Sequence, residues 1–395
     1  MIKMKSLGAV LICAFALPSF AQDDLIDKVK NNGSDTKGEF VFETLVDLEA
    51  TPVKDQGSSG TCWSYATTSF VESEMIRNGK EPVDLSEMFT VRMVYLDKAE
   101  KYVRLHGHLN FAQGGALPDV LYVLKKYGAM PYEKYNGLNY GTDRNKHSEL
   151  EALLKAQLDQ VIKNPNGKLT KSWRIAFVAT LDAYLGEVPE TFEWEGKTYT
   201  PRSFADEYVG VNADDYVQIT SFSHFQPNPY YKEVTIQVPD NWTWGTSYNV
   251  PLNEMMETLD NSLNKGFSVS WATDVSEKGF SLKNGLAILP LDVSKEARKE
   301  MFKGPKPEIM VSEESRQEEY DNYSTSDDHG MQITGMVKDQ VGTVYYMVKN
   351  SWGERANANR TGYIYASESF VKAKTISILV HKDAVPKSLK KKLDI

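Results

Sequence analysis

Residues 55–63 read DQGSSGTCW, and this stretch decides what kind of fold the chain can form. Cys62 follows a turn that contains two glycines and precedes a helical pattern in which Trp63, Ala66 and Phe70 share one face. A cysteine at a helix N-terminus lies at the positive end of the helix dipole, which lowers the pKa of its thiol. The stretch therefore predicts that Cys62 is a reactive thiolate, and an inert buried cysteine is the alternative.

The first 21 residues have the pattern of a secretory signal peptide. Two lysines precede an apolar run at residues 7–17 that is too short to span a membrane, and residues 19–21 (SFA) fit a cleavage site. We expect cleavage there and export of the chain, either to the periplasm or out of the cell. Cys13 would leave with this segment, so Cys62 would remain as a single unpaired thiol.

Composition and charge are those of a globular protein without a nucleic-acid partner. The chain has 395 residues, of which 41% are hydrophobic and 25% charged, so it can bury a large core. Its 45 basic and 54 acidic residues give a net charge of −9, which becomes −11 when the two lysines of the signal peptide are removed. A nucleic-acid binder needs a basic face, so we expect none. We also expect no membrane contact after signal cleavage.

Helical patterns occupy the first half of the chain, and strand patterns dominate the second. Helices are predicted at residues 63–78, 86–102, 119–127, 148–163, 171–185 and 252–264. Strands are predicted at residues 39–48, 233–238, 267–272, 331–337, 343–349 and 376–380. This order predicts an α+β protein with a helical lobe and a sheet lobe, and a site in the cleft between them.

A thiol nucleophile needs a base, and the chain offers six histidines. They are His106, His108, His147, His224, His329 and His381. His329 opens one strand pattern and Asn350 ends the next, so two neighbouring strands can present an imidazole and a carboxamide together. The Asn350 oxygen can accept the imidazole N–H and thereby select one tautomer, and the indole of Trp352 can keep water out.

These motifs together resemble those of papain-type cysteine peptidases. The matching stretches are TPVKDQG at 51–57, SGTCW at 59–63, His329, and NSWG at 350–353. The papain pattern separates cysteine and histidine by ~130–150 residues, whereas Cys62 and His329 are 267 apart. The resulting large insertion makes the chain similar to the bleomycin hydrolase and aminopeptidase C branch, over nearly its whole length after the signal peptide.

The resemblance implies a role for each site residue. Cys62 would be the nucleophile, His329 the general base and acid, and Asn350 the residue that orients the imidazole. Gln56 would form the oxyanion hole together with the backbone N–H of Cys62. Trp352 would shield the site from water.

The same resemblance implies structural roles for two glycines and one serine. Gly114 and Gly115 match a glycine pair that lets a substrate backbone lie close along the cleft, and an ordinary tight turn is the alternative. Ser59 stands where papain relatives carry half of a disulfide, which agrees with the lack of a partner cysteine.

The implied architecture is a papain-like two-lobe fold with a helical lobe, a β-barrel-like lobe and a large, mainly helical insertion. We expect a signal peptide at 1–21, an N-terminal arm at 22–45, the helical lobe at 46–140, the insertion at 141–230, the β lobe at 231–385 and a C-terminal tail at 386–395. The basic tail is expected to be exposed. A homo-oligomer is left open.

The expected activity is hydrolysis of peptide bonds through a thioester on Cys62, with peptides as substrates and neither cofactor nor metal. The resemblance implies aminopeptidase action on short peptides. Relatives of this branch carry a C-terminal arm whose end meets the substrate amine. This chain ends 45 residues after Asn350, so the arm looks truncated and endopeptidase action is the alternative. A different class of function is also considered, in which the chain is an inactive peptide-binding or assembly protein. Transfer of the acyl group to an amine instead of water is a further alternative.

Two polar features leave alternatives of their own. His106 and His108 have a spacing found in metal sites, but the sequence shows no third ligand near them. Asp328 is either solvated or faces the cleft, where it would disfavour acidic substrate groups.

Overall fold

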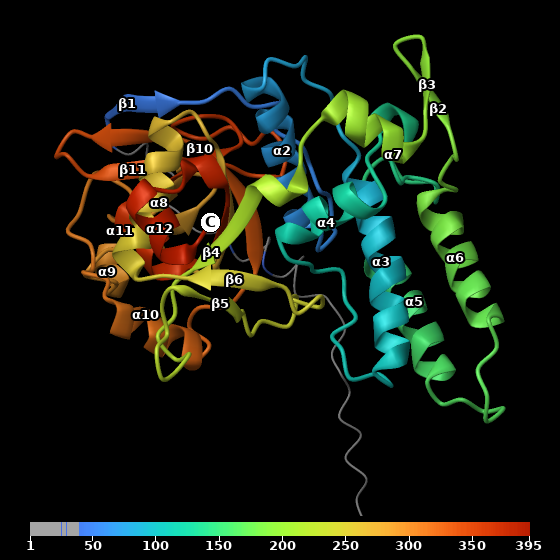
Figure 1. Cartoon of the computed structure of the whole chain (residues 1–395). Coiled ribbons are helices and arrows are strands. Elements are labelled where there is room, and N and C mark those ends of the chain that lie inside the picture. Colours follow the sequence, from blue (N-terminus) through green and yellow to red (C-terminus); the bar gives the residue numbers. More distant parts are fainter. Residues whose placement is uncertain (1–24, 26–28, 30–38) are drawn as a thin grey trace, which may run out of the picture.

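The computed structural model describes Leu25, Val29 and residues 39–395. The predicted signal peptide, Cys13 within it and most of the predicted N-terminal arm lie outside the described residues. Figure 1 shows a lobe of helices on the right and a lobe built on a large sheet on the left. No helix in the described part of the chain is both long and apolar enough to cross a membrane.

The sheet lobe contains one mixed sheet of eleven strands. They are β1 (Phe42–Asp47), β4 (Tyr216–Thr220), β5 (Lys232–Thr235), β6 (Thr246–Asn249), β7 (Val269–Thr273), β8 (Phe280–Ser281), β9 (Leu286–Ala287), β10 (His329–Asp339), β11 (Val344–Lys349), β12 (Tyr363–Ser367) and β13 (Thr375–His381). The order is β5-β6-β4-β13-β7-β10-β11-β12-β9-β8, and β1 pairs with β10. The strands β4, β6, β8, β9 and β12 were not predicted, because runs of two to five residues carry little periodic signal.

The long strand β10 lies inside the sheet and positions the start of the site. It pairs antiparallel with β7 on one side and with β11 on the other. Gln332 of β10 faces Lys349 of β11 in this register. The start of β10 therefore lies beside the segment that follows β11, where the Asn350 side chain reaches His329, as the sequence predicted.

The helical lobe is built from four helices whose apolar faces form one core. They are α3 (Glu87–Arg104), α4 (Pro118–Lys126), α5 (Ser148–Val161) and α6 (Ser172–Leu185), with a short η1 turn (Tyr132–Lys134) after α4. All four agree with predicted helices to within a few residues. Helix α3 starts where predicted because the Ser86 hydroxyl accepts a hydrogen bond from the backbone N–H of Phe89 at 3.0 Å.

The region predicted as a mainly helical insertion, 141–230, contains strands as well. After α5 and α6 it forms a hairpin and three short helical segments: β2 (Phe192–Trp194), β3 (Lys197–Tyr199), α7 (Pro201–Ser203), η2 (Phe204–Val209) and η3 (Ala213–Asp215). The Phe204 ring stacks on that of Tyr208, with 4.9 Å between their centroids. The region also contains β4, which pairs with β13, so the sheet lobe starts before residue 230.

Helix α2 (Cys62–Arg77) lies between the two lobes and begins at Cys62, as predicted (Figure 1). It packs against β7 and β10 on one side and against α3 and α4 on the other. Because both sides are covered, the polar side chains of α2 need partners inside the protein. Thr67, for example, lies 2.9 Å from Ser270 of β7 between the two hydroxyl oxygens.

The remaining helices cover the sheet lobe and include the end of the chain. They are α8 (Leu252–Asn264), α9 (Lys295–Arg298), α10 (Glu313–Asp321), α11 (Glu368–Lys374), η4 (Lys382–Ala384) and α12 (Lys387–Leu393). The tail predicted to be exposed is therefore largely helical. Leu389 and Leu393 are buried in the core of the sheet lobe, because four residues separate them and place both on one helix face.

Candidate active site

The turn before Cys62 is held by hydrogen bonds. The Ser59 hydroxyl donates to the backbone carbonyl of Gln56 at 2.7 Å. Oε1 of Gln113 accepts a hydrogen bond from the backbone N–H of Gly60, also at 2.7 Å, and ties the turn to the next segment of the cleft wall. Ser59, which stands where papain relatives carry a disulfide cysteine, thus closes the turn with its hydroxyl instead.

His329 is held by two contacts from the segment that follows β11. Its Nε2 lies 2.8 Å from Oδ1 of Asn350, which can only accept, so Nε2 carries the proton. The indole of Trp352 stacks on the imidazole, with 4.3 Å between ring centroids and 25° between ring planes. Nδ1 is buried and has no hydrogen-bond partner among the described residues, so it is free to accept a proton.

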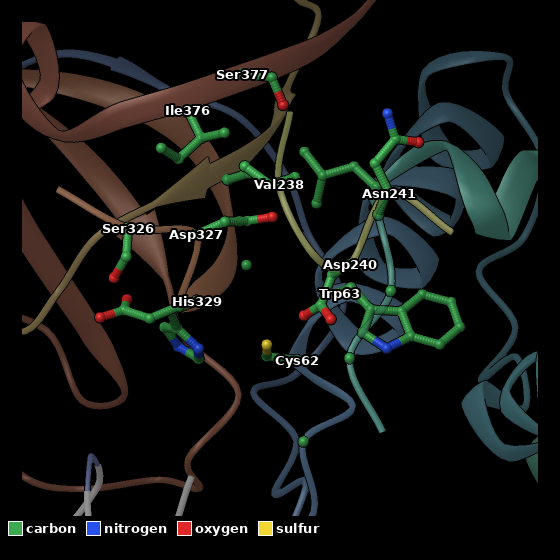
Figure 2. Close-up of a pocket in the computed structure, with 18 of the residues that line it drawn as sticks. Cys62, Trp63, Val238, Asp240, Asn241, Ser326, Asp327, His329, Ile376 and Ser377 are labelled. Atoms are coloured by element: carbon green, nitrogen blue, oxygen red, sulfur yellow. The ribbon is translucent and has the colours of Figure 1, made fainter. Parts of the chain in front are cut away.

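Cys62 and His329 line one cavity of about 430 Å³ between the lobes. Figure 2 shows the Cys62 sulfur and the His329 ring side by side on the floor of this cavity. Cys62 is 8% exposed and His329 only 2%, so little water reaches either group.

Burial raises the pKa of the Cys62 thiol to about 12. The carboxylates of Asp327 and Asp240 contribute to this rise in pKa, while the backbone N–H of Gly330 opposes it. The start of α2 does lower this pKa, through the backbone N–H of Trp63, but burial outweighs that contribution and the net shift is upward. The sequence could not show how deeply α2 is buried, nor that two carboxylates face the sulfur.

Burial also lowers the pKa of His329 to about 4, although the hydrogen bond to Asn350 opposes the shift. The two shifts together favour a neutral thiol beside a neutral imidazole at pH 7. No hydrogen bond joins the Cys62 sulfur to His329 in the described structure that would hold a thiolate–imidazolium pair.

Gln56 is fully buried next to the turn. The Ser351 hydroxyl donates to its Oε1 at 2.6 Å, and its Nε2 donates to the Ser59 carbonyl at 2.7 Å. These two bonds define which end of the amide carries the N–H groups. One of the two Nε2 hydrogens remains for a ligand. Ser351 was missed in the sequence, although it stands inside the NSWG motif.

The family model "Peptidase C1-like family" matches residues 12–395. The chain belongs to the Peptidase C1-like family. It is therefore a cysteine-type peptidase, as the sequence predicted.

Relatives and a solved structure agree with this assignment. Aminopeptidase C of Streptococcus thermophilus is 24% identical over 91% of this chain and 86% of that protein. Aminopeptidase G of Lactobacillus delbrueckii subsp. lactis is also 24% identical, over 88% and 84%. The crystal structure of PepW from Lactobacillus rhamnosis HN001 superposes with a TM-score of 0.71 at 20% identity, over 95% of this chain and 92% of that one. The papain-like α+β fold and the resemblance to the bleomycin hydrolase and aminopeptidase C branch are thus confirmed.

In this C1-like peptidase, Gly114 and Gly115 both line the cavity. A Cβ at Gly114 would lie 1.9 Å from Oδ2 of Asp240, and one at Gly115 would lie 2.8 Å from the Trp63 ring. Both glycines are thus required by close contacts within the protein. These contacts add to the predicted role of a glycine pair beside a substrate backbone.

The cavity of the peptidase is acidic. Four carboxyl groups contribute to its lining, from Glu151, Asp240, Asp327 and Asp328, and the described lining contains no lysine or arginine. Asp328 thus faces the cleft, and it accepts a hydrogen bond from the backbone N–H of Val275 at 2.9 Å. The other three acids were missed, because they lie in segments without a recognisable motif.

The C-terminal residue Ile395 lies away from the cavity. It packs against the core of the sheet lobe, and its backbone N–H donates to the Lys390 carbonyl at 3.2 Å. It does not contribute to the lining, whereas Leu25 from the N-terminal segment does.

One group of carboxylates has the spacing of a metal site. Oxygen atoms of Glu72, Asp84 and Glu87 lie within 4.8 Å of one another. The Lys54 ammonium pairs with all three, at 2.9, 2.6 and 2.7 Å, and takes the place that a cation would need. The histidines of the His106–His108 pair belong to no such group among the described residues.

Proposed function

We propose that this peptidase is an aminopeptidase that cleaves short peptides through a thioester on Cys62. The observation that carries the proposal is the hydrogen bond between His329 Nε2 and Asn350 Oδ1 at 2.8 Å. It leaves Nδ1 free beside the thiol, in a cavity open to a ligand. The names of the relatives, Aminopeptidase C and Aminopeptidase G, support the direction of cleavage.

In the first half of the reaction, the sulfur of Cys62 attacks the carbonyl carbon and its proton passes to Nδ1 of His329. The negative charge that forms on the carbonyl oxygen is stabilised by the backbone N–H of Cys62 and by Nε2 of Gln56. Loss of one such donor costs about 3 kcal/mol of transition-state stabilisation. The His329 imidazolium then gives its proton to the leaving amine, and the thioester remains.

In the second half, water replaces the amine. His329 takes a proton from the water as it attacks the thioester, and returns it to the sulfur when the acid product leaves. Asn350 keeps the imidazole in the same tautomer through both halves. The stacked ring of Trp352 keeps solvent away from the His329–Asn350 hydrogen bond.

Fluorogenic aminoacyl coumarins with free and with acetylated N-termini would test the proposal. We expect the wild-type protein to hydrolyse the free-amine compound faster and Cys62→Ala to hydrolyse neither. Faster turnover of the acetylated compound would favour the endopeptidase alternative. If iodoacetamide fails to label Cys62 in the folded protein and Cys62→Ala leaves turnover unchanged, the chain is not a thiol peptidase.

We also propose that the protein is exported. The support is the pattern of the first 21 residues, with its two lysines, apolar run and small residues before the cleavage point. Cell fractionation with N-terminal sequencing would test this: a mature chain outside the cytoplasm should begin at Gln22. An uncleaved chain in the cytoplasm would contradict it.

A further inference from the structure

Two carboxyl groups face each other across the cavity above Cys62. Asp327 comes from the segment just before β10, and Asp240 from the loop between β5 and β6. Figure 2 shows both side chains pointing into the same opening, with the sulfur below them. Their charges act on Cys62, since both raise the pKa of its thiol.

Asp327 has no partner of its own. It makes no hydrogen bond or ion pair with any described residue, although it lies in the wall of a cavity. Its neighbours Asp274 and Asp328 differ in this respect. Asp274 accepts bonds from Ser276 and Ser326, and Asp328 accepts one from Val275. A carboxyl group placed in such a position without a donor is a group that a ligand can satisfy.

Asp240 is held in place by its loop and by the helical lobe. Its Oδ1 accepts a hydrogen bond from the side chain of Asn110 at 3.0 Å. The indole N–H of Trp242, two residues later, donates to Asp119 at 2.7 Å. Asp240 therefore stands at a fixed position against Gly114, where an extended peptide that continued along the glycine pair would meet its carboxylate.

A third acid adds an independent indication of a cationic ligand. Glu151 of α5 is 7% exposed and lines the same cavity, yet its Oε2 is buried without a hydrogen-bond partner. The charge of Lys98 lowers the pKa of Asp240, but its ammonium is already engaged by the carbonyl oxygens of Ala112 and Gly114 and does not line the cavity. The cavity thus has negative groups in excess and no cation of its own among the described residues.

We propose that Asp327, with Asp240 opposite it, binds the ammonium group of the substrate. The inference rests on the proposed function and identifies the groups that would recognise a peptide's free N-terminus. A chain whose first residue is held between these carboxylates has its first peptide bond near Cys62. The Asp240 carboxylate fills the space over Gly114 and would then stand in the way of residues ahead of that amine, as aminopeptidase action requires.

An ammonium group can come from the N-terminus or from a lysine side chain, and substrates can separate the two. Four compounds are needed: coumarin amides of leucine and of lysine, each with a free and with an acetylated amine. We expect the free leucine compound to be cleaved well and the acetylated leucine compound poorly. Cleavage of acetyl-lysine amide at the rate of the free leucine compound would assign the site to a basic side chain.

The isosteric variants Asp327→Asn and Asp240→Asn test the carboxylates directly. We expect each to raise KM for the free leucine compound at least tenfold and to leave KM for the acetylated compounds unaffected. A change in kcat that acts through the Cys62 thiol is common to both kinds of compound, so discrimination against acetylation falls. Asp214→Asn, an exposed acid far from the cavity, is the matched control and should behave as wild type. Unchanged discrimination in both cleft variants, with intact thermal unfolding, would overturn the proposal.

A binding measurement separates this inference from the proposed function. Isothermal titration of Cys62→Ala with leucinamide and with N-acetyl-leucinamide requires no turnover. We expect leucinamide to bind at least tenfold more tightly, and this preference to vanish when Asp327→Asn is added. Equal binding of the two amides would overturn the ammonium site even if the peptidase is active. A clear preference in a protein that hydrolyses nothing would overturn the proposed function alone.

Discussion

His329 can serve as a base because one side chain decides where its proton lies. Oδ1 of Asn350 accepts from Nε2, and the same oxygen also accepts from the backbone N–H of Ser351 at 2.8 Å. The second contact holds the carboxamide with its oxygen toward the ring. Nδ1 is thereby left as the nitrogen without a proton or a hydrogen-bond partner among the described residues.

Replacement of Asn350 by alanine should lower kcat by about 10²-fold, because a base in the wrong tautomer or orientation is a poor proton acceptor. KM should change little, since Asn350 does not line the cavity. Steady-state kinetics on an aminoacyl coumarin would measure both. The exposed Asn166→Ala is a suitable control. A change in KM with an unchanged kcat would contradict the orienting role of Asn350.

A second prediction concerns Gln56, the proposed oxyanion donor. Gln56→Ala should lower kcat by about 10²–10³-fold, as expected for the loss of one oxyanion donor. Gln56→Glu should be as damaging, because it places a negative charge where negative charge develops. Activity within a few fold of wild type in both variants would show that the second donor is another group.

At the scale of elements, α12 is bound to the sheet lobe by two leucines among four lysines. Leu389 and Leu393 are buried in the same core as α8 and β13, while Lys391 is exposed. The tail was predicted to be exposed because of its lysines. Their number makes the four-residue spacing of the two leucines hard to see in the sequence. The helix is thus stabilised by packing more than by its own propensity.

Leu389→Ala should lower the free energy of unfolding by about 2–4 kcal/mol, because it removes buried methyl groups and leaves a cavity. Lys391→Ala, on the exposed face of the same helix, should change it by less than about 0.5 kcal/mol. Urea titrations of both variants would measure the difference. Equal effects would mean that α12 does not pack as described.

At the scale of the whole molecule, the acidity of the cavity arises only where the two lobes meet. Burial, together with the nearby carboxylates of Asp240 and Asp274, raises the pKa of Asp327 to about 8. Below that pH the carboxyl is largely protonated and attracts a cation weakly. His329, whose pKa is lowered to about 4, stays neutral through this range.

The ratio of KM between Asp327→Asn and wild type, for a free-amine substrate, should therefore rise as pH increases from 6 to 8. The substrate amine loses its charge near pH 8, so the rise between pH 6 and 7, where the amine stays charged, is the part that reports on Asp327. Each pH unit below the pKa lowers the ionised fraction about tenfold, which sets the size of the effect. A ratio that does not vary with pH would show that Asp327 does not ionise to bind the amine.

The same raised pKa affects stability. Asp327 ionises near pH 4 in the unfolded chain and only near pH 8 in the folded one, so its favourable contribution is complete below about pH 4 and lost as pH rises through 8. Wild type should lose roughly 2–4 kcal/mol relative to Asp327→Asn between pH 5 and 9. Urea unfolding at several pH values would measure this, and parallel curves would contradict it.

The site residues divide clearly between those that the sequence could reveal and those that it could not. Cys62, Gln56, His329 and Asn350 stand in short motifs whose residue types are required by the chemistry, so they are readable in a linear chain. Three acids of the cavity lie in separate segments. Asp240 is in a loop, Asp327 stands just before a strand, and Glu151 is in a helix of the other lobe. Nothing local distinguishes them from solvated acids.

The sequence by itself thus determined the family, the α+β class, the start of α2 and the pairing of His329 with Asn350, because each depends on local spacing or on one strand register. Tertiary structure decided the burial that keeps Cys62 neutral, the place of the last helix and the acidic cavity. The physical reason is that burial and charge sum over residues far apart in the chain. DQGSSGTCW contains the nucleophile, but the groups that surround it in space set its pKa.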